Sequence, residues 1–251
     1  LHDLPEFLCE LQSSIVGRSP VRTLCRVYGP RNGDSAERCC GAQEVQFIGK
    51  WYKEVLMARN VIIGQSGGPT AVINSSLAGV YKAACSLGAD KVYGMKYGIE
   101  GLLKEELVEL NVLLDDRLSI ELLKRTPSSY LGSCRYKLPE PEADSTPYVK
   151  LFTLFDKYDI CAVFYIGGND SMDTIAKLSR YGAQAGSAVR FIGVPKTIDN
   201  DLCLTDHTPG YGSAAKYIAT ILKEVIRDSS VYDIRSVTVA EIMGRHAGWL
   251  A

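Results

Sequence analysis

Seven consecutive apolar residues, 160–166, constrain the fold of this chain more than any other stretch. A strand that is buried on both faces of a sheet is apolar throughout and rich in β-branched and aromatic residues, as this run is. It ends in Gly167-Gly168-Asn169-Asp170-Ser171, and a helix is predicted to follow with Asp170 or Ser171 as its N-cap. We expect the buried side of that helix to carry Met172, Ile175, Ala176 and Leu178.

A similar unit begins at Asn60. The apolar residues 61–63 predict a short strand, the glycine-rich turn 65–70 follows, and a helix of about 16 residues is predicted after it. Its apolar positions are Ala71, Ile73, Leu77, Val80 and Ala84. Gly67 and Gly68 let backbone N–H groups approach an anion, and the positive end of the helix points the same way. A paired glycine is also an ordinary tight turn, so both interpretations stay open here.

The third unit ends in the most polar strand terminus of the chain. The apolar run 189–194 is followed at once by Pro195-Lys196-Thr197-Ile198-Asp199-Asn200-Asp201. In an open parallel sheet, ligands bind beyond the carboxyl ends of the strands. A lysine there can offset phosphoryl charge, and a carboxylate can accept a proton or hold Mg²⁺. The alternative is a polar loop with an Asx-type turn at Asp199-Asn200.

The remaining segments continue the alternation of strands and helices. We predict strands at 91–95 and 236–242, and helices at 119–124, from Pro147 to about Lys157, and after Ser213. The last of these helices is amphipathic and aligns Ile218, Ile221, Leu222 and Val225. This order predicts an α/β fold, a doubly wound and mostly parallel sheet with helices on both faces.

Composition excludes several classes of function. The 28 basic and 29 acidic residues nearly cancel, so no overall field attracts nucleic acid or an acidic membrane. No apolar run reaches the roughly 18 residues of a membrane span, and the first residues lack the order of a signal peptide, so we expect a cytoplasmic location. Any phosphate must be met by local groups such as Arg135, which follows a small-residue turn; a solvated surface arginine is the alternative.

The cysteines and the first 58 residues give weaker signals. Eight cysteines occur without a Cys-x-x-Cys pair and with only three histidines, which predicts free thiols, places Cys161 in the core and argues against a zinc site. Residues 1–58 contain half of the cysteines and show no sustained periodicity. We interpret them as an N-terminal extension of unknown role.

Five motifs in order resemble the phosphofructokinase family. They are Ser66-Gly67-Gly68-Pro69-Thr70, Leu131-Gly132-Ser133-Cys134-Arg135, Gly167-Gly168-Asn169-Asp170-Ser171, Pro195 to Asp201, and Met243-Gly244-Arg245. The resemblance covers about residues 60–251. Within the family, an aspartate at position 170 and a lysine at position 196 resemble the pattern of the pyrophosphate-dependent branch. That branch implies reversible glycolytic phosphoryl transfer from pyrophosphate to the 1-hydroxyl of fructose 6-phosphate, giving fructose 1,6-bisphosphate and phosphate. The two substrates are then its partners.

The resemblance also implies a role for each motif residue. Catalysis is expected of Asp199 as the base, Thr197 as the residue that orients the hydroxyl, and Lys196. The donor phosphates are expected to contact Gly67, Gly68, Arg135, Lys196 and Asp170. The sugar phosphate is expected to contact Thr197, Asp199, Asp201, Met243, Gly244 and Arg245. The implied cofactor is Mg²⁺, with Asp170, Asn169 and Asp201 as its candidate ligands.

Two departures from the family pattern bear on activity. Asn169 stands where family members commonly carry an aspartate, so Asp170 is expected to supply the metal contact. The sequence also ends soon after Arg245, where the family continues with a second domain. We therefore expect residues 59–251 to form a donor domain cut off before the sugar-phosphate domain is complete, and incomplete for activity. The resemblance further implies a homo-oligomer, either a dimer or a tetramer.

Three alternatives remain open from the sequence. One is an ATP-dependent phosphofructokinase. Another is a related kinase of the NAD or lipid kinase type, which explains the Gly-Gly-acid turn but not Lys196, Thr197, Asp199 and Asp201 together. The third is a noncatalytic or truncated regulatory subunit, which the neutral Asn169 favours and the intact Thr197, Asp199 and Asp201 oppose.

Overall fold

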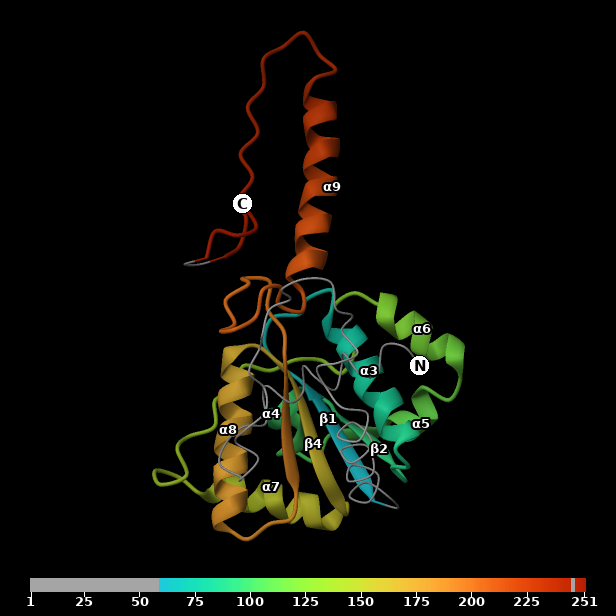
Figure 1. The fold of residues 1–251 in the computed structure, drawn as a ribbon, viewed down its shortest axis with the longest axis vertical. Helices are drawn as coiled ribbons and strands as arrows, with labels where there is room; N and C mark the ends of the chain where they lie inside the picture. Colours follow the sequence, from blue (N-terminus) through green and yellow to red (C-terminus); the bar gives the residue numbers. More distant parts are fainter. Residues whose placement is uncertain (1–58, 245–246) are drawn as a thin grey trace, which may run out of the picture.

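A five-stranded sheet forms the centre of the computed structural model, which describes residues 59–244 and 247–251. The strands lie in the order β3-β2-β1-β4-β5 (Figure 1). Their bounds are β1 Asn60–Gln65, β2 Val92–Met95, β3 Leu107–Glu109, β4 Ile160–Gly167 and β5 Arg190–Pro195. β1 pairs in parallel with β2 and β4, β4 pairs in parallel with β5, and only the β2–β3 pair is antiparallel. The predicted mostly parallel sheet is confirmed.

Helices cover both faces of this sheet (Figure 1). Their bounds are α3 Ile73–Ser86, α4 Gly98–Leu102, α5 Leu110–Leu113, α6 Arg117–Arg125, α7 Thr146–Lys157, α8 Asn169–Gln184 and α9 Tyr211–Ser229. Alternating β4 side chains divide the core in two, because successive residues of a strand point to opposite faces. Phe164 and Ile166 pack on the side of α3, α5 and α6. Val163 and Tyr165 pack on the side of α4, α7 and α8.

β4 is the most deeply buried strand, as its sequence predicts, since all eight of its residues are buried. Cys161 is 1% exposed within it, and burial raises the pKa of its thiol. Among the described residues, Cys85, Cys134 and Cys203 are free thiols as well. The predicted thiols at positions 9, 25, 39 and 40 lie outside the described residues, as does the predicted extension 1–58.

Three local predictions are wrong. α3 begins at Ile73, two residues later than predicted, because Ala71 belongs to the preceding turn. The N-cap of α8 is Gly168 rather than Asp170 or Ser171, and no side chain caps it. Ala176 is exposed on that helix because the positions that face the sheet are set by Ile175 and Leu178.

The predicted strand at 236–242 is also wrong. These residues have no regular structure, and Val237 and Val239 are 91% and 89% exposed. An apolar β pattern forms a strand only where a neighbouring strand pairs with it, and none of the described strands does so here. The segment instead runs back beside α9, and both project away from the sheet (Figure 1).

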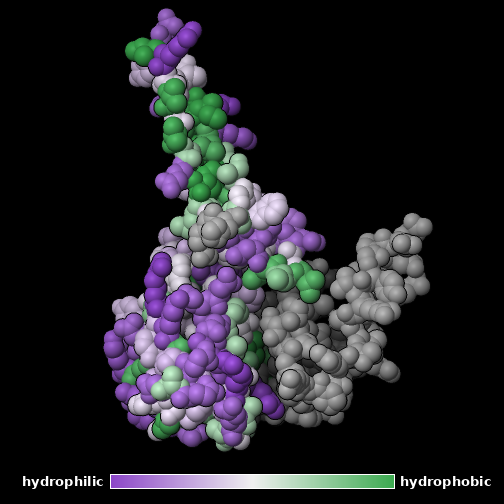
Figure 2. All heavy atoms as spheres, turned by 90° about the vertical axis from the view of Figure 1, so that its left-hand side faces the viewer, coloured by the Kyte–Doolittle hydropathy of each residue, from purple (hydrophilic) through white to green (hydrophobic). Residues whose placement is uncertain are grey.

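α9 begins at Tyr211, three residues before the predicted start after Ser213, and its apolar side is not enclosed. None of its residues is buried, and Ile221 is 37% exposed. Figure 2 shows apolar side chains gathered along this projection. Among the described residues, no helix is both long and apolar enough to cross a membrane.

Candidate functional site

Three strands bring the predicted motifs to the carboxyl end of the sheet. β1, β4 and β5 are parallel neighbours, so their carboxyl ends lie together, and Gly167 is paired with Pro195. The loops that follow are joined through the backbone. Ser66 N–H donates to the Ile166 carbonyl at 2.9 Å, and Lys196 N–H donates to the Gly167 carbonyl at 2.9 Å. The turns after the three strands therefore share one rigid support.

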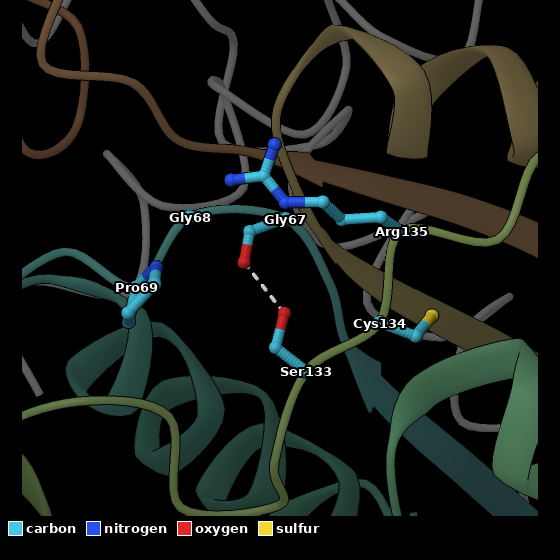
Figure 3. A pocket seen from close by; sticks show the side chains of 6 residues that line it. All are labelled: Gly67, Gly68, Pro69, Ser133, Cys134 and Arg135. Carbon is cyan, nitrogen blue, oxygen red and sulfur yellow. Dashed lines mark hydrogen bonds between the residues drawn. The ribbon is translucent and has the colours of Figure 1, made fainter.

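The glycine turn and the Arg135 segment form a hollow of about 320 Å³ at this end of the sheet (Figure 3). Its lining residues are Gly67, Gly68, Pro69, Ser133, Cys134 and Arg135. The Ser133 hydroxyl donates to the Gly67 carbonyl at 2.5 Å, and Gly67 N–H donates to the Cys134 carbonyl at 3.2 Å. The exposed Arg135 side chain extends toward the glycine turn (Figure 3). A guanidinium so placed can bind phosphate oxygens in the hollow.

The backbone of the turn differs from the simple anion cradle that the sequence suggests. Gly67 has a φ of +78°, which only glycine adopts freely, but its N–H is already bonded within the protein. α3 begins five residues after Gly68, so its N-terminus does not open directly from the glycine pair. The buried Thr70 hydroxyl oxygen has no hydrogen-bond partner among the described residues. The Gly67 amide is therefore already engaged, and the charged donors near this turn are the side chains of Arg135 and Lys196.

Lys196 supplies a buried positive charge directly beneath the turn. The residue is 5% exposed, and its ammonium donates to the Gly68 carbonyl. A methyl group added at Gly67 would lie 3.7 Å from the Lys196 Nζ. Burial lowers the pKa of Lys196, and the negative charge of Asp199 partly offsets that shift. The structure thus brings Gly67, Gly68, Arg135 and Lys196 together, as a phosphate site requires.

Asp199 is held near this lysine by the loop that carries both. It is 6% exposed, and its backbone N–H donates to the Thr197 hydroxyl oxygen at 3.0 Å. Thr197 is itself fixed, because its N–H donates to the Pro209 carbonyl at 3.0 Å and it forms a parallel bridge with Gly210. The carboxylate is consequently presented on a braced loop rather than a mobile one.

The side chains of Thr197 and Asn200 fix the backbone of this loop, where the sequence left an Asx-type turn as the alternative. The Thr197 hydroxyl closes the turn, while the Asn200 side chain braces the return of the chain. Asn200 Oδ1 accepts from Thr208 N–H at 2.9 Å, and its Nδ2 donates to the Asp206 carbonyl at 3.1 Å. Asn200 also has a φ of +54°, a conformation that asparagine tolerates better than most residues. The side chains of Thr197 and Asn200 therefore hold the backbone on both sides of Asp199.

The three candidate metal ligands are exposed residues. Asn169 and Asp201 are exposed, and the Asp170 carboxylate forms a 3.3 Å ion pair with Lys137. Within the described residues, no group of three or more His, Cys, Asp or Glu side chains could hold a metal ion. Mg²⁺ is commonly held by one or two carboxylates together with substrate phosphates and water. Asp170 and Asp201 could supply such carboxylates, and metal binding stays a prediction.

The residues predicted to contact the sugar follow α9. Met243 is 70% exposed, Gly244 is buried, and Arg245 lies outside the described residues. The Gly244 carbonyl accepts from Ala247 N–H at 2.7 Å. Their contact with fructose 6-phosphate stays a prediction.

Comparison with known proteins agrees with the five motifs. A family model described as "Phosphofructokinase" matches residues 60–251. The chain belongs to the phosphofructokinase family. Two curated relatives named pyrophosphate–fructose 6-phosphate 1-phosphotransferase are those of Halomonas elongata and Methylococcus capsulatus. The first is 46% identical over 197 residues, which cover 76% of this chain and 46% of the relative. The second is 42% identical over 205 residues, with coverage of 78% and 47%.

Solved structures give the same result. The crystal structure named pyrophosphate-dependent phosphofructokinase from Nitrosospira multiformis is similar with a TM-score of 0.69 and 43% sequence identity. The match covers 77% of this chain and 48% of that one. The chain thus spans about half the length of the curated relatives it matches.

Some side chains of the site escape sequence reasoning. Ser133 and Thr70 both lie within recognised motifs, but their contacts are seen only in the structure. The Ser133 hydroxyl bonds to the Gly67 carbonyl, whereas the Thr70 hydroxyl has no partner among the described residues. Lys137 was not predicted as a site residue, although its position two residues after Arg135 is a usable signal. Its ion pair with Asp170 joins residues 33 positions apart, which periodicity does not reveal.

Proposed function

We propose that this chain forms the donor side of a pyrophosphate-dependent phosphofructokinase. The reaction is transfer of a phosphoryl group from pyrophosphate to the 1-hydroxyl of fructose 6-phosphate. The observation that carries the proposal is the buried Lys196 ammonium, which lies beneath Gly67 and Gly68 with Arg135 on the rim. Burying a lysine ammonium costs free energy unless an anion pairs with it, and pyrophosphate concentrates negative charge in a small volume.

Asp170 supports pyrophosphate over ATP as the donor. Its carboxylate occupies the first turn of α8, beside the turn that carries the phosphate-binding groups. In the family pattern this position faces the α-phosphate of a nucleotide, which a carboxylate repels. Names of the relatives at 42–46% identity support the same donor.

The proposed chemistry uses the braced loop after β5. Asp199 accepts the proton of the sugar 1-hydroxyl as that oxygen bonds to the nearer phosphorus, and the bridging P–O bond of pyrophosphate breaks to release phosphate. The Thr197 hydroxyl orients the attacking group. Lys196 and Arg135 hold the donor and neutralise its charge. Asp170 and Asp201 are the residues proposed to hold Mg²⁺, which neutralises phosphate charge when bound.

The remaining parts of the proposal concern the protein as a whole. We assign Met243, Gly244 and Arg245 to fructose 6-phosphate, and a homo-oligomer and a cytoplasmic glycolytic role follow from the family resemblance.

The test is turnover by the native protein at its full length, with fructose 6-phosphate, Mg²⁺ and either pyrophosphate or ATP. The proposal predicts formation of fructose 1,6-bisphosphate with pyrophosphate and little with ATP. Preference for ATP would assign the chain to the ATP-dependent branch. Binding of pyrophosphate without turnover by either donor would instead support a noncatalytic subunit.

A further inference from the structure

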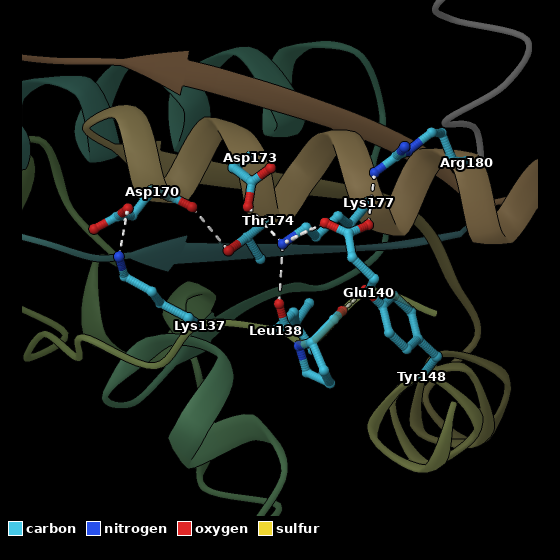
Figure 4. A network of polar contacts seen from close by, with 10 residues as sticks. Lys137, Leu138, Glu140, Tyr148, Asp170, Asp173, Thr174, Lys177 and Arg180 are labelled. Atoms are coloured by element: carbon cyan, nitrogen blue, oxygen red, sulfur yellow. Dashed lines mark hydrogen bonds and ion pairs between the residues drawn. The ribbon is translucent and has the colours of Figure 1, made fainter. Parts of the chain in front are cut away.

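We infer that Lys137 is a further pyrophosphate ligand, which exchanges its ion pair with Asp170 for a donor phosphate when pyrophosphate binds. The inference rests on the proposed function and adds a residue that none of the recognised motifs contains. Lys137 Nζ lies 3.3 Å from Asp170 Oδ1 at the start of α8 (Figure 4). The same segment carries Arg135, which lines the hollow two residues earlier.

The backbone around Lys137 is fixed at both ends. On the hollow side, the Cys134 carbonyl accepts from Gly67 N–H. On the other side, Lys177 of α8 donates to the Leu138 carbonyl at 3.1 Å, and its side chain is only 10% exposed. Tyr148 OH also donates to the Pro139 carbonyl at 2.7 Å. These anchors hold the base of the Lys137 side chain between the phosphate hollow and α8.

A cluster of charges strengthens the second anchor. The Lys177 ammonium forms ion pairs with Asp173 at 2.8 Å and Glu140 at 3.1 Å, and Arg180 forms another with Glu140 at 3.2 Å (Figure 4). Lys177 and its partners thus join the segment to the same helix that presents Asp170. Their charges are satisfied within the cluster, which makes Lys177 a positioning residue rather than a ligand.

The Lys137–Asp170 pair, in contrast, is free to exchange. Its side chains are 74% and 76% exposed, and a pair of this kind is screened by water and adds little to folding. Pyrophosphate with Mg²⁺ offers a better partner to each member: several anionic oxygens for the ammonium and a divalent cation for the carboxylate.

The experiment compares Lys137→Met, Asp170→Asn and the double variant in the native full-length protein. Calorimetry gives the Kd of pyrophosphate with Mg²⁺, and turnover gives kcat and KM. Lys137→Met is expected to raise the Kd about tenfold, the usual effect of losing one charge-assisted contact, with little change in kcat or in Tm. Lys137→Arg is expected to retain most of the affinity. Lys91→Met is the matched control, because Lys91 also forms an ion pair, with Glu109, but lies at the amino end of β2.

The double variant distinguishes a ligand from a screening charge. If Lys137 binds phosphate, Lys137→Met weakens binding in the Asp170→Asn background as well. Full recovery in the double variant would mean that Lys137 only screens Asp170 and would overturn the inference, as would an unchanged Kd in Lys137→Met. Failure of the wild-type protein to use pyrophosphate in turnover is a separate result, which counts against the proposed function.

Discussion

Replacing Lys196 with methionine separates the stability of the donor site from its function. Methionine has a similar length and no charge, and it fills the space of the lysine stem. The buried ammonium donates to the Gly68 carbonyl and lies near Gly67. Because burial lowers its pKa, the folded protein holds this charge at a cost. We therefore expect a weaker site in a protein that is no less stable.

The size of each effect follows from these contacts. A hydrogen bond to a charged group contributes about 1.5–3 kcal/mol, so losing one to pyrophosphate raises its Kd roughly 10- to 150-fold. In the free protein, the lost bond from the ammonium to the Gly68 carbonyl costs about 1.5–3 kcal/mol, and relief of the desolvated charge offsets this cost. At about 2–4 °C per kcal/mol for a protein of this size, Tm should stay within a few degrees of the wild type.

The assay measures Tm without ligand and the Kd of pyrophosphate by calorimetry, in the native full-length protein. Lys91→Met serves as the control, since Lys91 pairs with Glu109 at the amino end of β2, away from the carboxyl ends that carry the site. A fall in Tm of about 10 °C with an unchanged Kd would refute the reasoning, because Lys196 would then be a structural residue.

The pH dependence provides an independent check on Lys196. Its folded-state pKa is below the ordinary value, so between those two values the unfolded chain binds more protons than the folded one. Its contribution to the free energy of unfolding therefore rises with pH through that window. Pyrophosphate favours the ammonium, so its affinity should fall as the pH rises through the same window. Lys196→Met should lose both dependences, whereas titration of pyrophosphate itself persists in the variant.

Three other sets of substitutions test the rest of the site. Asp199→Asn should lower kcat by about 10²–10⁴-fold with little change in the Kd of pyrophosphate, and a loss below tenfold would remove Asp199 from the role of base. Changing Asp170 and Lys196 together to glycine should raise the ratio of kcat/KM for ATP to that for pyrophosphate, by more than either single change; an unchanged ratio would place donor choice elsewhere. Gly67→Ala places a side chain at a φ of +78° and should lower the free energy of unfolding by about 1–2 kcal/mol. A methyl group at Gly68 meets no atom within 4 Å, so Gly68→Ala should leave Tm unchanged. Equal shifts of the two variants in a thermal melt would contradict this account.

Segments with a strong local pattern could be predicted from the sequence. The strand at 160–166 is apolar throughout because helices cover both of its faces, and that burial is what its composition indicates. Pro147 marks the first turn of α7, where its missing N–H costs nothing. The carboxyl ends of β1, β4 and β5 carry the polar motifs because the parallel order of these strands brings them together.

Features that depend on a distant partner could not be predicted. Residues 236–242 resemble a strand in pattern, but a strand also needs a neighbour to pair with, and a pattern does not specify one. Lys177 resembles any surface lysine in the sequence, yet its bond to the Leu138 carbonyl anchors the segment beside the hollow. The N–H of Gly67 is likewise engaged by Cys134, a contact across 67 positions that changes which groups can bind an anion.

The most direct test of the donor assignment is the Kd of pyrophosphate compared with that of ATP, measured calorimetrically in the native full-length protein with Mg²⁺. The buried Lys196, the exposed Arg135 and the carboxylate of Asp170 predict tighter binding of pyrophosphate. The difference should shrink when Asp170 and Lys196 are both glycine. Equal or tighter binding of ATP by the wild-type protein would contradict the assignment.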